Sequence, residues 1–181
     1  KGIGQTGYQA ALPDNISEAR LETVNYYDDY AFLDRYSSEL GMVKSDFQLK
    51  RGNATGLQTG CLQTTNTGDR LLNVYWYDAK GRLTDSRSLY IGKRLTACHT
   101  DYTYTSKAAR IENKEYDLGN GSKKLTVDYC QRNDYSAKTD RLLTSTLTVN
   151  GKSAVIRRLS YDDLGRIARV GRGTKGSTVD Y

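Results

Sequence analysis

The sequence is poor in proline and in large apolar side chains. Its 181 residues include one proline (Pro13), one tryptophan and two phenylalanines, and only 37% of the residues are hydrophobic. No stretch approaches the roughly 20 consecutive apolar residues that a membrane-spanning helix needs. We therefore predict no membrane span, and sheet layers that are exposed on one side rather than a thick dry core.

Cysteine and histidine are also scarce. Cys61, Cys98 and Cys130 are far apart, and the absence of C-x-x-C excludes a zinc ribbon and a disulfide-dense scaffold. His99 is the only histidine, and as the neighbour of Cys98 in a strand it points to the opposite face, which makes a poor nucleophile–base pair. We predict no catalytic residue, no metal site and no cofactor. One disulfide with a free thiol, or three buried thiols, both remain open.

Two further patterns have a structural explanation. The adjacent carboxylates Asp28-Asp29 and Asp162-Asp163 are interpreted as turn residues that accept backbone N–H groups. The stretch GRGTKGST (171–178) lacks the order G-x-x-x-x-G-K-[ST] that cradles phosphates. The chain is therefore predicted not to be an enzyme.

The net charge of +6 is distributed unevenly. Residues 1–40 contain three basic and seven acidic side chains, whereas residues 151–181 contain seven basic and three acidic ones. A basic end is compatible with a nucleic-acid or glycan surface, with a solvated sheet face, or with attraction between the two ends. Nucleic acid is the less favoured partner, because the basic residues are dispersed and no known nucleic-acid-binding motif accompanies them.

Tyrosine and glycine are abundant, with 15 and 17 residues, and they mark a repeated motif. The stretches YWYDAKGRL (75–83) and SYDDLGRI (160–167) share Tyr-Asp-x-x-Gly-Arg followed by an aliphatic residue. We identify two degenerate copies between them, and the starting tyrosines are 25, 27 and 32 residues apart. The motif residues are Tyr77, Asp78, Gly81 and Arg82; Tyr102 and Lys107; Tyr129 and Arg141; and Tyr161, Asp162, Gly165 and Arg166. Such a period indicates one supersecondary unit per repeat.

Each motif is predicted to be the tip of a β-hairpin. Tyrosine ends one strand, aspartate accepts backbone N–H groups, glycine supplies a positive φ, and arginine opens the return strand with its stem across a neighbouring ring. Asn150-Gly151 predicts a two-residue hairpin turn, and DLGNGSKKL (117–125) predicts another turn.

The predicted fold is all-β: an antiparallel array of β-hairpins in a curved, open sheet. Residues 57–181 form the repeats, and residues 1–56 form an N-terminal segment. In that segment ARLETVNYYDDY (19–30) favours a strand ending in a turn, and AFLDRYSSELG (31–41) favours a short helix closed by Gly41. A short array has unpaired strand edges, which predicts docking with further repeats or with a second copy.

The recurring Tyr-Asp-x-x-Gly-Arg motif, with its strand-forming flanks, resembles the YD repeats of the bacterial Rhs family, over roughly residues 22–170. The resemblance implies a shell fragment or miniature member, extracellular or at the bacterial cell surface, and related to toxin delivery. The chain has room for too few repeats to enclose a cargo domain, and the family's Pro- and Asp-containing autoprocessing motif is not found. A removed signal peptide would leave no trace in a sequence that starts at Lys1.

The aromatic residues on successive strands allow a second interpretation. Tyr75, Trp76, Tyr90 and Tyr104, with Tyr77 and Tyr102, could form a platform on which sugars stack. The alternative is that these rings are cross-strand packing pairs, which we favour because their positions follow the hairpin motif. The predicted function is thus a non-catalytic structural or interaction protein, with a glycan-binding module as the alternative.

Overall fold

The computed structural model describes residues 22–50, 52–173 and 177–180, and of residues 177–180 only the backbone. Its elements in chain order are β1 (Thr23–Asp28), α1 (Phe32–Arg35), α2 (Ser37–Leu40), the 3₁₀ helix η2 (Gly41–Phe47), β2 (Ala54–Thr64), β3 (Arg70–Tyr77), β4 (Leu83–Tyr90), β5 (Arg94–Tyr102), β6 (Ala108–Asp117), η3 (Gly119–Gly121), β7 (Lys124–Tyr135), β8 (Leu142–Val149), β9 (Lys152–Tyr161), β10 (Ile167–Arg172) and β11 (Ser177–Asp180).

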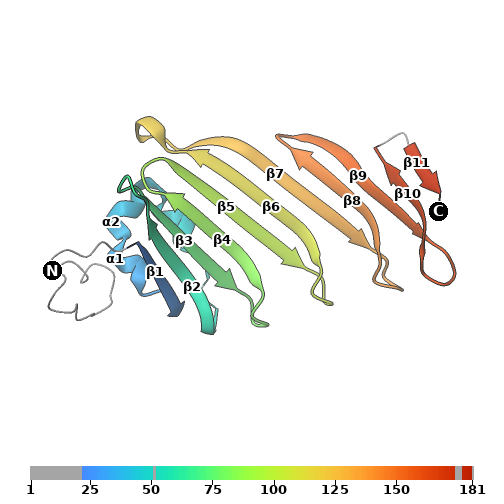
Figure 1. Cartoon of the computed structure of the whole chain (residues 1–181), viewed down its shortest axis with the longest axis horizontal. Coiled ribbons are helices and arrows are strands. Elements are labelled where there is room, and N and C mark those ends of the chain that lie inside the picture. The colour runs from blue at the N-terminus through green and yellow to red at the C-terminus, as the bar shows by residue number, and fades with distance from the viewer. Residues whose placement is uncertain (1–21, 51, 174–176, 181) are drawn as a thin grey trace. The chain divides into compact units, whose positions relative to one another are not determined.

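The strands follow one another in chain order, from β1 to β11, in a single open sheet (Figure 1). Neighbours such as β2 and β3, or β8 and β9, pair antiparallel and are joined by short turns. This confirms the predicted all-β class and the open antiparallel sheet. The predicted N-terminal strand is β1, and the predicted helix is the short helical stretch that reaches Leu40, where Gly41 follows with φ +48°. None of the helices in the described ranges has the length and apolar composition needed to cross a bilayer.

The chain divides into two compact units, described separately below. The N-terminal unit comprises residues 1–97 and 116–124, and the C-terminal unit comprises residues 98–115 and 125–181. The expected division near residue 57 falls inside β2, a strand of the N-terminal unit.

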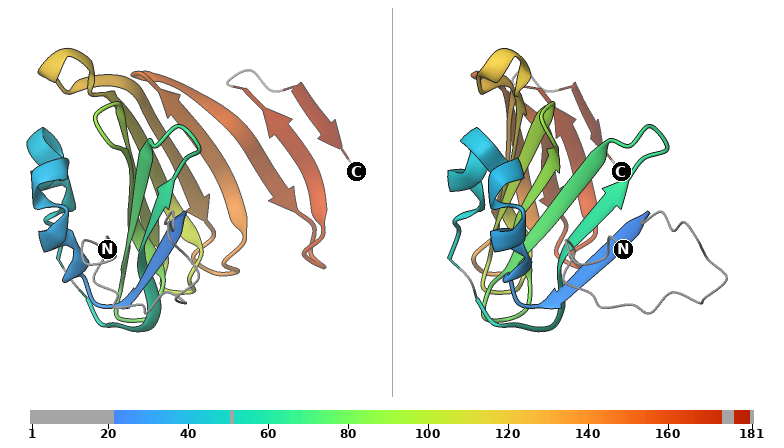
Figure 2. Two further views of the ribbon diagram at one scale, coloured as in Figure 1. Left: turned by 60° about the vertical axis from the view of Figure 1, so that its left-hand side comes forward. Right: turned by 90° about the vertical axis from the view of Figure 1, so that its left-hand side faces the viewer.

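The N-terminal unit has a dry core, because its helical segment covers one face of the sheet (Figure 2). Alternate residues of β3 face this cover, and Leu72, Val74 and Trp76 are each at most 1% exposed. The Trp76 ring stacks on Tyr30 at 5.9 Å and lies 6.2 Å from Phe47. The core is therefore a helix-on-sheet layer, thicker than the composition suggested.

A glycine in β2 permits close packing of this cover. The Phe32 ring stacks on Tyr26 at 4.1 Å, and a Cβ atom on Gly60 would lie 2.4 Å from the tip of the Phe32 ring. The buried hydroxyl groups of Tyr26 and Tyr36 form a hydrogen bond with each other at 2.6 Å. A side chain at residue 60 would therefore force the Phe32 ring to shift away from the sheet.

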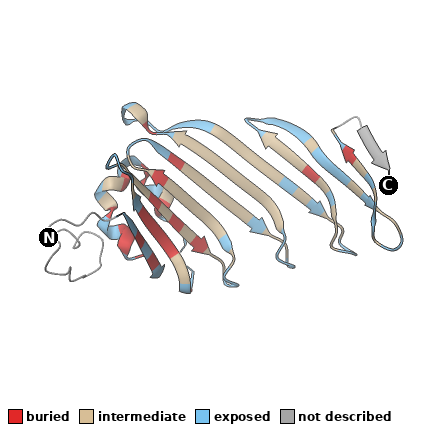
Figure 3. Ribbon diagram, in the orientation of Figure 1, coloured by how far each residue is buried: buried red, intermediate tan, exposed pale blue. Residues whose placement is uncertain are grey.

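The C-terminal unit has a different character, since none of its described hydrophobic side chains is fully buried (Figure 3). Its buried side chain is polar: Ser145 is 3% exposed and donates a hydrogen bond to Asn133 at 2.7 Å. Gln131 donates to both Asn133 and Ser145, at 3.0 and 3.2 Å, and accepts from Tyr129 at 2.8 Å. The described side chains of this unit are thus held together by a polar ladder rather than by an apolar core.

The Asn150-Gly151 hairpin turn is confirmed. Both residues have a positive φ, +47° and +80°, as a two-residue turn of the primed type requires. The side-chain oxygen of Asn150 accepts a hydrogen bond from the Asp128 N–H at 2.8 Å, and the Asn150 N–H donates to the Asp128 carbonyl at 2.8 Å. The turn between β8 and β9 is thus also attached to β7.

Candidate functional site

The first intact motif forms a closed turn around the carboxylate of Asp78. One oxygen of Asp78 accepts from the backbone N–H groups of Lys80 and Arg82, at 2.8 and 3.0 Å. The other oxygen accepts from Arg82 Nε at 2.7 Å and forms an ion pair with Arg82 Nη2 at 2.6 Å. Gly81 has φ +73° and donates its N–H to the Asp78 carbonyl at 3.0 Å. Asp78 and Gly81 therefore have the backbone roles that were predicted for them.

The second intact motif repeats the main bonds of this geometry. Asp162 accepts from the Arg166 N–H at 2.8 Å and from Arg166 Nε at 2.7 Å. Gly165 has φ +80° and donates to the Asp162 carbonyl at 2.8 Å. Hydrogen bonds from Arg166 are the main cause that holds the pKa of Asp162 below its usual range, and Arg82 does the same for the pKa of Asp78.

The degenerate copy at Tyr102 keeps the turn with different side chains. The Thr103 N–H donates to the Lys107 carbonyl at 2.8 Å, and the Thr103 hydroxyl accepts from the Lys107 N–H at 3.1 Å. Ser106 takes the glycine position at φ +68°. A hydroxyl thus replaces the carboxylate, and a small polar residue tolerates the left-handed backbone.

The third copy does not start at Tyr129, which is a correction to the sequence-based prediction. Tyr129 lies inside β7 opposite Val149, whereas Tyr135 ends that strand and Ser136 opens the turn. The Ser136 N–H donates to the Arg141 carbonyl at 2.8 Å, and Asp140 has φ +54°. This turn contains one more residue than the turns of the intact copies. The extra residue changed the spacing of the motif, so the copy was wrongly assigned to Tyr129.

One turn of the same kind escaped prediction. The Thr65 N–H donates to the Asp69 carbonyl at 2.8 Å, Gly68 has φ +86°, and the Thr65 hydroxyl accepts from the Asp69 N–H at 3.1 Å. This turn joins β2 to β3 and has no tyrosine before it. The pattern Thr65-x-x-Gly68 could have indicated this turn, because it has the same spacing as Thr103-x-x-Ser106.

Three tyrosines that end strands connect their hairpins to the preceding part of the chain. The Tyr77 hydroxyl donates to the Gln58 carbonyl at 2.6 Å, and the Tyr161 hydroxyl donates to the Leu142 carbonyl at 2.9 Å. The Tyr135 hydroxyl donates to the Ala108 carbonyl at 3.1 Å. The tyrosine hydroxyl therefore has a repeated structural role in both units.

In the C-terminal unit, the basic residue of one motif also contacts the tyrosine of the next. Lys107 Nζ lies 5.5 Å from the centre of the Tyr135 ring, and the Arg141 guanidinium lies 5.3 Å from the centre of the Tyr161 ring. Lys107 also pairs with the Asp140 carboxylate at 2.7 Å. Arg141 packs so close to Gly165 that a Cβ atom there would lie 1.8 Å from Arg141 Nη2. These cation–π contacts join successive hairpin tips.

The hypothesised aromatic platform is only partly possible. Trp76 is 1% exposed beneath the helical segment, so its assignment to an exposed sugar platform is wrong. Tyr104 is 91% exposed, but it lies in the turn after β5, in the other unit. Tyr75 and Tyr90 share the uncovered face, because Tyr75 lies opposite Ser86 and Leu71 lies opposite Tyr90. Because side chains alternate along a strand, Trp76 lies on the opposite face of β3 from Tyr75 and Tyr77.

A shallow groove lies on this uncovered face. Its volume is about 370 Å³, and its lining consists of Thr65, Leu71, Ser88, Tyr90, Arg94 and Thr96. The Tyr90 hydroxyl donates to Asp69 at 2.5 Å, and Lys93 Nζ lies 4.5 Å from the centre of the Tyr90 ring. Hydrogen bonds from Tyr90 and Lys93 lower the pKa of Asp69. The Asp69 carboxylate in turn holds the Tyr90 hydroxyl in place.

All three cysteines are free thiols, as in the second of the two alternatives, but only Cys61 is buried, whereas Cys98 and Cys130 are partly exposed. Cys61 is buried, and desolvation raises the pKa of its thiol. The sulfur of Cys98 donates to Asn113 at 3.5 Å, and His99 Nε2 lies 3.1 Å from Asp101. In the described ranges, no three His, Cys, Asp or Glu side chains come together in a way that could hold a metal ion.

No protein-family model matches the chain, and no curated protein matches it significantly.

Proposed function

We propose that this protein is a non-catalytic structural and interaction protein of the YD-repeat type, part of an Rhs-type shell on a bacterial surface or in a secreted toxin-delivery system. The carrying observation is the repeated linkage of hairpin tips, in which the motif tyrosine donates to a carbonyl of the preceding chain. Because the Asp78 and Asp162 carboxylates accept backbone and arginine donors, the motif is explained by turn formation without any chemistry.

Among the described residues, the last motif has no contact between its basic residue and a following tyrosine ring. Lys107 and Arg141 each contact a following tyrosine ring, whereas Arg166 contacts no ring among the described residues, and its side chain is 74% exposed. An added hairpin, or a second copy of the chain, would supply the ring that this position accepts. The partner we propose is therefore another strand carrying a motif tyrosine.

Sedimentation equilibrium over a concentration series tests this proposal. We expect the full chain to self-associate, and we expect Arg166→Glu to weaken the association by about tenfold, since it removes a cation–π contact and adds a repulsive charge. Lys152→Glu, at the opposite end of β9, is the matched control and should leave the association unchanged. A chain that stays monomeric at every concentration, or an equal effect of both variants, contradicts the proposal.

The groove beside Tyr90 favours a second candidate, a glycan-binding module. An aromatic ring flanked by hydroxyl groups and an arginine is a suitable lining for a sugar, and the groove volume lies within the range of small-molecule sites. A screen of neutral sugars with Tyr90→Ala tests it, with Tyr27→Ala, 51% exposed and outside the groove lining, as the control. Trp76→Ala is unsuitable as a test of sugar binding, because Trp76 belongs to the core. Sugar binding lost in Tyr90→Ala alone, with the thermal melt retained, would favour this candidate.

A further inference from the structure

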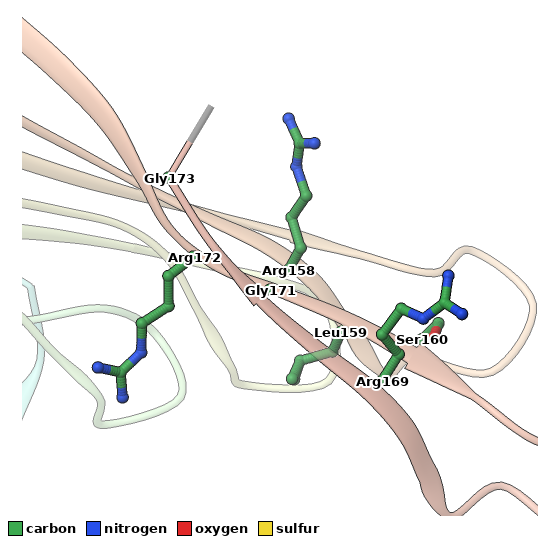
Figure 4. Close-up of a pocket in the computed structure, with 7 residues that line it drawn as sticks. All are labelled: Arg158, Leu159, Ser160, Arg169, Gly171, Arg172 and Gly173. Atoms are coloured by element: carbon green, nitrogen blue, oxygen red, sulfur yellow. The ribbon is translucent and has the colours of Figure 1, made fainter. Parts of the chain in front are cut away.

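A pocket of about 280 Å³ lies on the hairpin formed by β9 and β10 (Figure 4). Its lining consists of Arg158, Leu159, Ser160, Arg169, Gly171, Arg172 and Gly173. This described lining combines three arginines with two glycines and contains neither an acidic nor an aromatic residue. The charged side chains of this lining are therefore all basic, in the part of the sequence where basic residues predominate.

The strand register places two of these arginines on the same face. Arg158 lies opposite Gly171, and Arg169 lies opposite Ser160, so Arg158 and Arg169 are diagonal neighbours. Diagonal neighbours on a sheet are about 7–8 Å apart, a spacing that two long side chains can close around one anion. Figure 4 shows Arg158 and Arg169 extending to one side of the hairpin and Arg172 to the other. Gly171 has no side chain and leaves the hollow between them.

The charge of Arg158 is poorly compensated within its own row of residues. The side chain of Arg158 forms no ion pair or hydrogen bond with another described residue, and the residue opposite it on β8 is the neutral Thr144. Further along this row, Asp134 lies opposite Thr144, two strands away from Arg158. On the other side, the register puts Asp180 of β11 opposite Arg169. The Arg158 guanidinium is thus available to form a bidentate pair with an oxyanion.

We propose that this pocket binds a sulfate or phosphate ester group carried by a polysaccharide. Arg158 and Arg169 provide the guanidinium donors, and the Ser160 hydroxyl provides a neutral donor. A polysaccharide is favoured over single-stranded nucleic acid, because the described lining has no aromatic ring on which a base could stack. The site goes beyond the proposed structural role and does not depend on Arg166 or on self-association.

Titration calorimetry of the full chain tests the site, with heparin as the sulfated probe and phosphomannan as the phosphorylated probe, both at one fixed salt concentration. We expect at least one probe to bind, and Arg158→Gln/Arg169→Gln to reduce its affinity by about tenfold or more, as expected for the loss of charge-assisted hydrogen bonds. The matched control is Lys152→Gln/Arg157→Gln, which removes the same charge from exposed positions of β9 outside the pocket lining. Its affinity should change by less than about twofold.

Three results would overturn the inference. Equal losses in the two double variants would show attraction to net charge rather than a site. Absence of binding to both probes would show that the pocket takes neither ester. Tighter binding of a single-stranded oligonucleotide than of either polysaccharide, with the same dependence on Arg158, would assign the pocket to nucleic acid. Thermal melts of both variants verify that the fold is retained, and sedimentation of the same variants keeps this outcome separate from the self-association test.

Discussion

The two units use the same hairpin turns but differ in what covers their strands. In the N-terminal unit, one face of β3 lies beneath the helical segment, and Leu72 and Val74 are fully buried. In the C-terminal unit, Gln131, Asn133 and Ser145 hydrogen-bond along β7 and β8. A sheet with a covered face gains stability from apolar burial, whereas a sheet without a cover relies on cross-strand pairs and backbone hydrogen bonds. The hairpin motif is therefore independent of the core.

Removal of Trp76 should have the largest effect and should be confined to the N-terminal unit. Trp76→Ala is expected to cost about 3–5 kcal/mol in the free energy of unfolding, because it leaves a cavity beneath the helical segment. Hydrogen exchange measures where protection is lost, and we expect losses in β2 to β4 but not in β8 and β9. Tyr104→Ala is the exposed control and should change nothing. Equal loss of protection in both sets of strands would show that the two units unfold as one.

Valine at the motif glycine should have the next largest effect, and it should differ between the units. Gly81→Val is expected to cost about 2 kcal/mol, because a β-branched residue must adopt φ +73°. Gly165→Val should cost more by about 0.5–1 kcal/mol, because the new Cβ displaces Arg141 from the Tyr161 ring. Urea unfolding of both variants measures the difference. Gly81→Asn is the control, since Asn150 already has a positive φ in this chain; equal costs of the two valine variants would contradict the account.

Removal of the motif hydroxyl should affect the two units equally. Tyr77→Phe and Tyr161→Phe each delete one hydrogen bond to a backbone carbonyl, and each should cost about 1 kcal/mol. The same urea unfolding curves provide the measurement, and Tyr27→Phe, at a position that is 51% exposed, is the control. A loss seen only for Tyr77 would mean that the hydroxyl matters only beside a buried core.

Acid should weaken both intact turns, with the smallest effect on overall stability. The pKa values of Asp78 and Asp162 are lowered in the folded protein, chiefly by hydrogen bonds from Arg82 and Arg166. Their contribution is thus present above the ordinary aspartate pKa of about 4 and is lost as the pH falls through the folded values. Thermal melts between neutral pH and pH ~3 should show a smaller acid-induced decrease for Asp78→Asn/Asp162→Asn than for the wild type. Parallel decreases in the two proteins would assign the acid sensitivity to other carboxylates.

Much of the fold could be predicted because turn formation is a local property. Asp78 and Arg82 are four residues apart, and Asn150 and Gly151 are adjacent, so these turns depend on few neighbours. The third copy was misplaced at Tyr129, because an extra residue in the turn after Tyr135 disrupts the fixed spacing. The turn from Thr65 to Asp69 was missed because a threonine hydroxyl can perform the same role as an aspartate carboxylate.

The sequence by itself determined the strand-forming segments, the hairpin tips and the unequal charge of the two ends, since all of these follow from residue type and short-range spacing. Only the tertiary structure decided which face of β3 is covered, and so whether Trp76 is a core residue or a surface residue. Alternating side chains specify two faces but do not say which face the helical segment will cover. The links from Lys107 to Tyr135 and from Arg141 to Tyr161 likewise depended on strand pairing, because they join residues that the chain separates by a whole hairpin.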